Sequence, residues 1–188
     1  PYTGITSAED WNAFIAALIA GDISAFVNPE TSEVDLNADI EFELQPEFPV
    51  DAENNPAVFS GVLNGNGKTL TCQAFTRPLF SEIGEAGIVK DLTIRGSFTS
   101  LANAGEAGNA TITKVNKGHI LRCSNYTDTE LSVKASTIFG TIAAQNGGTI
   151  EECRNYGSIK ISAAMGSSVA GGYYGGGISA IGHTVEGP

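Results

Sequence analysis

Four tyrosines are the side chains in this sequence whose type and spacing best suit the binding of a ligand. Tyr126 and Tyr156 each follow an asparagine, in "SNYT" and "RNYG", and lie thirty residues apart. Tyr173 and Tyr174 lie together in the glycine-rich stretch "VAGGYYGGGIS", which could fold over the other two rings. Aromatic rings stack on sugars and other planar groups. These four tyrosines are therefore the candidate ligand-binding residues, and the alternative is that each ring lies on its own stretch of chain as a structural element.

Charged residues give a weaker indication of catalysis. A site that cleaves polysaccharides needs paired carboxylates for acid–base chemistry, or basic residues beside a calcium ion. The candidates are Asp91, Arg95, Arg122, Asp128 and Arg154. Their positions do not repeat in a way that would build a catalytic groove. We therefore predict that the chain is not an enzyme.

Metal and cofactor sites are not expected. Three cysteines, two histidines far apart in the sequence, and no CxxC or HExxH motif make a zinc site improbable. The carboxylates of one predicted strand face are expected to be solvated rather than to bind a cation, because no calcium-loop pattern surrounds them. These carboxylates are Asp35, Asp39, Glu41 and Glu43.

A repeated line of sequence explains the spacing of the tyrosines. Residues 117–133 read "KGHILRCSNYTDTELSV" and residues 147–162 read "GGTIEECRNYGSIKIS", with glycine, isoleucine, cysteine, asparagine and tyrosine matching at one offset. A longer series places Leu63, Leu92, Cys123 and Cys153 at equivalent positions, 29 to 31 residues apart. A fixed period of this length is typical of a solenoid.

The content of each repeat selects the kind of solenoid. Short alternating strands separated by Gly/Asn corners follow one another, and no amphipathic helix occurs after Gly21. We therefore predict an all-β fold, a right-handed parallel β-helix of about four to five coils. Cys123 and Cys153 should be reduced thiols on adjacent coils, because a disulfide between in-register side chains would be strained. Asn125 and Asn155 should form a ladder that satisfies corner backbone groups.

The first residues carry the signals of one helix. Ser7 and Asp10 have capping-box spacing, Gly21 can end the helix, and the residues between them form one apolar face. That face consists of Trp11, Phe14, Ile15, Leu18 and Ile19. Because a solenoid leaves its end coils bare, this helix is expected to cap the first coil. Residues 1–33 are thus predicted to be the capping helix and its loop, and residues 34–188 one β-helix domain.

Charge and hydropathy exclude several partners. The formal net charge is −11, from 21 acidic and 10 basic side chains, which argues against nucleic acid or an anionic membrane as partner. The longest apolar run, residues 13–21, is far shorter than the roughly 20 residues that a membrane-spanning helix needs. The chain begins without Met or a signal-peptide pattern, so we expect any export signal to have been removed.

Three stretches carry a resemblance to a known family. "FSGVLNGNGKTL", "PLFSEIGEAGIVKDLTIRG" and the "GxIxxCxNYG" line resemble repeat domains of surface proteins from gut Bacteroidetes and some Firmicutes. The similar repeats are those of adhesins and the GLUG-type or IgA-peptidase-associated regions. This resemblance covers roughly residues 5–182 and implies export to the cell surface, often as a lipoprotein or part of a larger surface protein. The pattern would continue after "GGISAIGHTVEGP", so we expect a C-terminal continuation.

Together these observations favour a non-catalytic, adhesin-like module that contacts an extracellular glycan or a host or cell-surface protein. The first alternative is a spacer or stalk of a larger surface protein. The second is a polysaccharide-active β-helix enzyme, for which the carboxylate pairing described above would be required.

Overall fold

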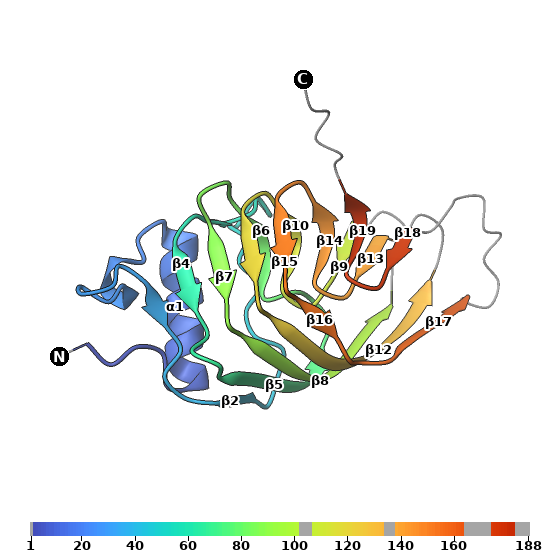
Figure 1. The fold of residues 1–188 in the computed structure, drawn as a ribbon, viewed down its shortest axis with the longest axis horizontal. Coiled ribbons are helices and arrows are strands. Elements are labelled where there is room, and N and C mark those ends of the chain that lie inside the picture. The colour runs from blue at the N-terminus through green and yellow to red at the C-terminus, as the bar shows by residue number, and fades with distance from the viewer. Residues whose placement is uncertain (1, 102–106, 134–137, 164–173, 183–188) are drawn as a thin grey trace, which may run out of the picture.

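The computed structural model describes residues 2–101, 107–133, 138–163 and 174–182. It is a β-solenoid of about four turns, with one α-helix at the N-terminal end (Figure 1). Every strand pairing between successive turns is parallel, as the sequence predicts for a β-helix. The parallel β-helix prediction is therefore confirmed.

The strands of successive coils form three main sheets and a small one, all ordered along the solenoid. The first sheet contains β1 (Val34–Asp35), β4 (Val62–Asn64), β7 (Ile88–Lys90), β11 (His119–Leu121) and β15 (Thr149–Glu151). The second sheet contains β2 (Ile40–Phe42), β5 (Thr69–Phe75), β8 (Thr93–Leu101), β12 (Ser124–Val133), β16 (Arg154–Asn155) and β17 (Ile159–Ala163). The third sheet contains β3 (Val58–Phe59), β6 (Phe80–Ile83), β10 (Thr113–Asn116), β14 (Ala143–Asn146) and β19 (Ser179–Gly182). The small sheet contains β9 (Ala107–Asn109), β13 (Ile138–Gly140) and β18 (Tyr174–Gly176).

Columns of equivalent apolar residues run through the interior of the solenoid. In the first sheet the register joins Val34, Leu63, Val89, Ile120 and Ile150 in one column. The first four of these side chains are buried. Each coil thus covers the apolar side chains of the next, which is why the sequence repeats its hydrophobic residues at a fixed period.

One predicted equivalence is wrong. Leu63 pairs with Val89, whereas the sequence had placed it opposite Leu92. Thr69 pairs with Thr93, so the offset falls from 26 to 24 residues across the Asn-Gly-Asn-Gly corner. That corner is two residues longer than the corresponding corner of the next coil, and it turns through the left-handed backbone of Asn66 at φ 50°. Because the two corners differ in length, residues before the corner have a different offset to their partners on the next coil from residues after it.

Helix α1 (Ala8–Ala20) begins and ends where the sequence predicts. The Ser7 hydroxyl accepts a hydrogen bond from the Asp10 N–H at 3.1 Å, and Gly21 ends the helix in the left-handed conformation. The Asp10 carboxylate accepts from the Thr6 N–H at 2.9 Å, one residue before the capping residue. A short 3₁₀ turn, η1 (Ser24–Phe26), follows. No helix in the described part of the chain is long and apolar enough to cross a membrane.

The apolar face of α1 covers the first coil, which confirms its role as a cap. The Trp11 ring lies 6.2 Å from the ring centroid of Phe42 on β2 and 6.1 Å from that of Phe80 on β6. Phe14 contacts Phe59 of β3 at 5.9 Å, and all three contacts are edge-to-face. This geometry suits aromatic pairs and shields the end of the core from water.

Candidate functional site

The structure brings Tyr126 and Tyr156 together on the outer face of the second sheet. Asn125 pairs in register with Asn155, so the tyrosine after each asparagine occupies the same place on neighbouring coils. The two rings are stacked, with centroids 4.6 Å apart and an interplanar angle of 15°. Both side chains are exposed, Tyr126 by 37% and Tyr156 by 53%. They form a continuous aromatic surface across two coils.

Two arginines extend this aromatic pair. The Arg95 guanidinium lies 4.3 Å from the Tyr126 ring centroid, on the coil before it. Arg154 donates a hydrogen bond from Nη1 to the Tyr156 hydroxyl at 3.2 Å. We call Arg95, Tyr126, Tyr156 and Arg154 the Tyr–Arg ladder. Because Tyr126 has Arg95 on one face and Tyr156 on the other, it offers a partner its edge and hydroxyl rather than a free ring face.

A buried asparagine ladder holds the backbone under these rings. Asn125 is fully buried and donates from Nδ2 to Oδ1 of Asn155 at 2.8 Å. Asn155 donates in turn to the Gly157 carbonyl at 3.0 Å, and the Tyr156 N–H donates to the Asn125 carbonyl at 2.7 Å. The predicted structural role of the two asparagines is confirmed. Their bonds fix the corner at which each tyrosine leaves the chain.

The structure contains a second asparagine ladder that was not predicted from the sequence. Asn116 is fully buried and donates to Oδ1 of Asn146 at 2.7 Å, and Asn146 donates to the Gly148 carbonyl at 3.2 Å. The two asparagines are thirty residues apart, as are Asn125 and Asn155. The same offset was therefore the signal that could have identified them.

Of the other two candidate tyrosines, the structure describes the backbone of Tyr174. Tyr173 lies outside the described residues. The backbone of Tyr174 begins β18 and pairs with Ile138 of β13 in the small sheet, whereas Tyr126 belongs to the second sheet. The closing of a glycine-rich loop over the rings stays a prediction.

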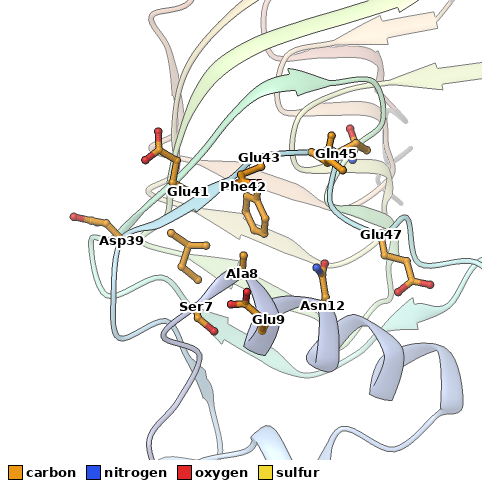
Figure 2. A pocket seen from close by; sticks show the side chains of 12 residues that line it. Ser7, Ala8, Glu9, Asn12, Asp39, Glu41, Phe42, Glu43, Gln45 and Glu47 are labelled. Carbon is orange, nitrogen blue, oxygen red and sulfur yellow. The ribbon is translucent and has the colours of Figure 1, made fainter.

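A groove between α1 and β2 was not foreseen from the sequence. It encloses about 660 Å³ and is lined by the first turns of the helix and by residues 39–45 and Glu47 (Figure 2). Glu41 and Glu43, expected on a solvated face, are exposed beside it. In Figure 2 Asp39 and Glu41 point away from the hollow.

The predicted grouping of four carboxylates on one strand face is wrong for Asp35. This residue lies on β1 in the first sheet, is only 7% exposed, and accepts a hydrogen bond from Asn28 at 2.8 Å. A corner separates it from Asp39, which accepts from the Thr69 N–H at 2.8 Å. Among the residues that the structure describes, no three Asp, Glu, His or Cys side chains are grouped so that they could hold a metal ion.

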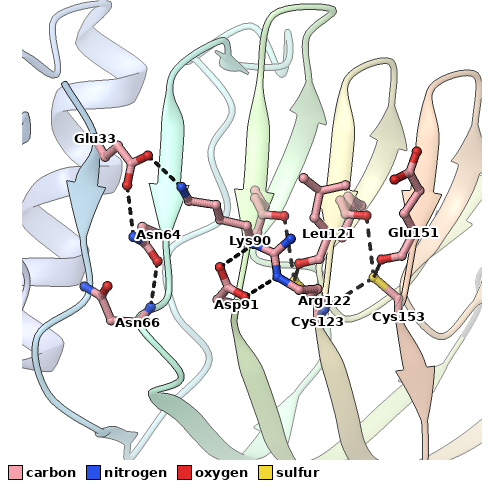
Figure 3. Close-up of polar contacts among 12 residues, drawn as sticks. Glu33, Asn64, Asn66, Lys90, Asp91, Leu121, Arg122, Cys123, Glu151 and Cys153 are labelled. Carbon is pink, nitrogen blue, oxygen red and sulfur yellow. Dashed lines mark hydrogen bonds and ion pairs between the residues drawn. The ribbon is translucent and has the colours of Figure 1, made fainter. Parts of the chain in front are cut away.

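The charged residues considered for catalysis make structural contacts. Arg122 donates two hydrogen bonds to the Asp91 carboxylate, at 2.7 and 2.8 Å (Figure 3). Asp128 accepts from the backbone N–H and the hydroxyl of Ser158, at 2.9 and 2.7 Å. The hydrogen bonds from Arg122 lower the pKa of Asp91, and those from Ser158 lower the pKa of Asp128. A general acid needs the opposite shift, so neither carboxyl is prepared for acid catalysis.

The two repeated cysteines lie on adjacent coils, as predicted. The Cys123 N–H donates to the Cys153 sulfur at 3.4 Å, and both residues are free thiols (Figure 3). Cys123 is fully buried and belongs to the core, whereas Cys153 is half-buried. Cys72 is also a buried free thiol. Cys72 and Cys123 are thus small core residues and Cys153 packs against the core, in agreement with the prediction.

No family model matches the chain, and no curated protein and no solved structure matches it. The resemblance to adhesin repeats therefore stays a prediction.

Proposed function

We propose that the chain is a non-catalytic binding module that holds an extended partner against the Tyr–Arg ladder on the second sheet. The observation that carries the proposal is the exposed stack of Tyr126 and Tyr156, extended by Arg95. Following the family resemblance, its location is the bacterial cell surface. The partner is a glycan or a protein exposed outside the cell.

The composition of the ladder supports binding. Tyrosine and arginine are enriched among the residues that dominate binding energy at protein interfaces. Stacking between coils and the buried bonds of Asn125 and Asn155 hold the rings in place before a partner arrives. A partner then loses little free energy to the ordering of these side chains.

The two alternatives receive less support. The enzyme alternative needs a carboxylate pair with an acid of raised pKa, whereas Asp91 and Asp128 are both held by structural hydrogen bonds. A spacer needs no exposed aromatic surface, because its length alone fulfils its role. It therefore leaves the Tyr–Arg ladder without a function.

The proposal is tested by binding of the intact chain to printed arrays of glycans and of extracellular protein domains. The variant Tyr126→Ala/Tyr156→Ala should lose about tenfold or more in affinity for each partner found. The matched control is Glu130→Ala/Lys160→Ala, which removes an exposed ion pair from the same two coils of the second sheet and should bind like the wild type. Undiminished binding by the tyrosine variant would contradict the proposal, and no binding by the wild type on either array would favour the spacer.

A further inference from the structure

The groove between α1 and β2 lies along a free sheet edge. β2 is the last strand of the second sheet: β5 pairs with one of its edges, and no strand in the described ranges pairs with the other. An unpaired edge presents backbone N–H and C=O groups that can pair with another chain. The groove volume of about 660 Å³ is within the range of about 300–1,000 Å³ found for ligand sites.

The rim of this groove carries unpaired negative charge. Its charged residues are all carboxylates, and no lysine, arginine or histidine lines it. Asp39 accepts one backbone hydrogen bond, whereas the other four have no hydrogen-bond or ion-pair partner within the described part of the chain. Those four are Glu9, Glu41, Glu43 and Glu47. Glu33 and Asp91 have cationic partners elsewhere in the molecule, whereas the negative charge of these four carboxylates is left for a basic partner to neutralise.

The same groove offers apolar contact. Leu44 is 77% exposed, the most of any exposed large hydrophobic residue among those described. Ile40 and Phe42 also line the groove, although only 3% and 5% of their surface is exposed, and Ala8 of α1 lines the opposite wall. A cation site needs several oxygen atoms that converge on one point. The described residues contain no group of three or more Asp, Glu, His or Cys side chains that could hold a metal ion, so the groove is not such a site.

We propose that this groove binds an extended, lysine- or arginine-containing segment of another polypeptide, which adds as a strand to the free edge of β2. Side chains alternate along such a strand, so every second residue lies beside the outward carboxylates Glu41 and Glu43. The other residues of the added strand face α1 and are small and apolar. Backbone hydrogen bonds supply affinity, and the alternating charges supply specificity.

Two fluorescein-labelled peptides test the proposal by fluorescence anisotropy. KVKVK carries alternating charge and can form a strand, whereas KPKPK has the same charge but lacks the backbone N–H groups of two residues. The wild type should bind KVKVK at least about tenfold more tightly than KPKPK, and the binding should weaken with added salt. Equal binding of both peptides would mean simple charge attraction, and no binding of KVKVK would also overturn the proposal.

Paired substitutions locate the site. Glu41→Gln/Glu43→Gln should weaken KVKVK binding by about tenfold, since it removes the carboxylate of β2 and the one directly after β2 that lie beside the lysines. Glu151→Gln/Glu152→Gln makes the same charge change at exposed residues on a distant coil and should leave binding unchanged. Circular dichroism confirms that both variants are folded. Equal binding by the two variants would place the peptide elsewhere and overturn the proposal.

Discussion

Asn125 donates its side-chain amide to Asn155 on the next coil, across 2.8 Å and in a fully buried environment. Each asparagine is followed by an exposed tyrosine, and those two rings stack as well. One pair of repeated residues thus aligns the coils inside the solenoid, and the next pair carries that alignment to the surface. The register of the core therefore sets the geometry of the candidate site.

The buried asparagine bond should contribute to stability. Replacing Asn125 with alanine leaves Oδ1 of Asn155 and the Thr127 N–H without their present partners. Unfolding in guanidinium, followed by circular dichroism, should show a loss of about 1–3 kcal/mol. Asn12→Ala, on the exposed side of α1, should stay within about 0.5 kcal/mol of the wild type. Equal effects of the two substitutions would contradict the structural role of the ladder.

The two stacked tyrosines should differ in their effect on stability. Tyr126→Ala removes contacts to both Arg95 and Tyr156, which predicts a loss of about 1–2.5 kcal/mol. Tyr156→Ala removes one ring contact and the exposed hydrogen bond from Arg154, and should cost about 0.5–1.5 kcal/mol. The double variant completes a cycle whose coupling energy measures the stack itself. A coupling energy near zero would show that the rings do not stabilise each other.

The ion pair between Asp91 and Arg122 predicts a pH dependence. The guanidinium lowers the pKa of Asp91 below its ordinary value, so the pair stabilises the fold above the unfolded-state pKa of about 3.9. This contribution is lost as the pH falls through the folded-state pKa. The difference in unfolding free energy between wild type and Asp91→Asn should therefore be largest at neutral pH and disappear in acid.

The measurement for Asp91 is a series of urea unfolding curves between about pH 7 and pH 2. Glu53→Gln provides the control, because Glu53 is exposed and makes no ion pair within the part of the chain described. A pH-independent difference for Asp91→Asn would argue against the ion pair as the cause.

The three thiols should react in a fixed order. A hydrogen bond from Cys123 lowers the pKa of the half-buried Cys153 thiol. The bond to Cys153, together with burial, raises the pKa of Cys123, and burial raises that of Cys72. Because the thiolate is the nucleophile, iodoacetamide should modify Cys153 first in the native protein. Peptide mass spectrometry over time checks this order, and equally fast labelling of Cys72 would contradict it.

The Cys123→Ala variant distinguishes the effect of the hydrogen bond on the pKa of Cys153 from the effect of the exposure of Cys153. Without the hydrogen bond from the neighbouring thiol, the pKa of Cys153 should rise and its alkylation near pH 7.5 should slow. Faster alkylation of Cys153 in this variant would contradict the prediction, because it would show that access to the thiol, and not stabilisation of the thiolate, controls the rate.

The solenoid could be predicted from the sequence because residues that stack on neighbouring coils are separated by the same number of residues. Cys123, Cys153 and the two Asn-Tyr pairs share one offset of thirty residues, and each meets its equivalent on the next coil. Leu63 was misplaced because the corner after it is two residues longer than its neighbour's. Corner length changes spacing without changing the hydrophobic pattern, so spacing alone cannot reveal it.

The acidic groove could not be predicted in the same way. Asp35 and Glu41 follow one alternating pattern in the sequence, but a corner between them sends Asp35 into the first sheet, where it is buried. Exposed Glu41 and Glu43 have the pattern of any solvated strand. They line a groove only because α1 packs across the end of the coil, which depends on tertiary contacts such as that between Trp11 and Phe42.

The capping helix also affects how the solenoid resists tension along its axis. Hydrogen bonds between coils run along the solenoid axis, so tension along that axis pulls directly on the bonds between all neighbouring coils. The N-terminal coil is anchored by the aromatic contacts of Trp11 and Phe14, which a pulling force must break together. At the other end of the described coils, Ile159 and Ile161 are 38% and 51% exposed. Opening the first coil under load should therefore take more force than opening a coil that is held by the hydrogen bonds between coils alone.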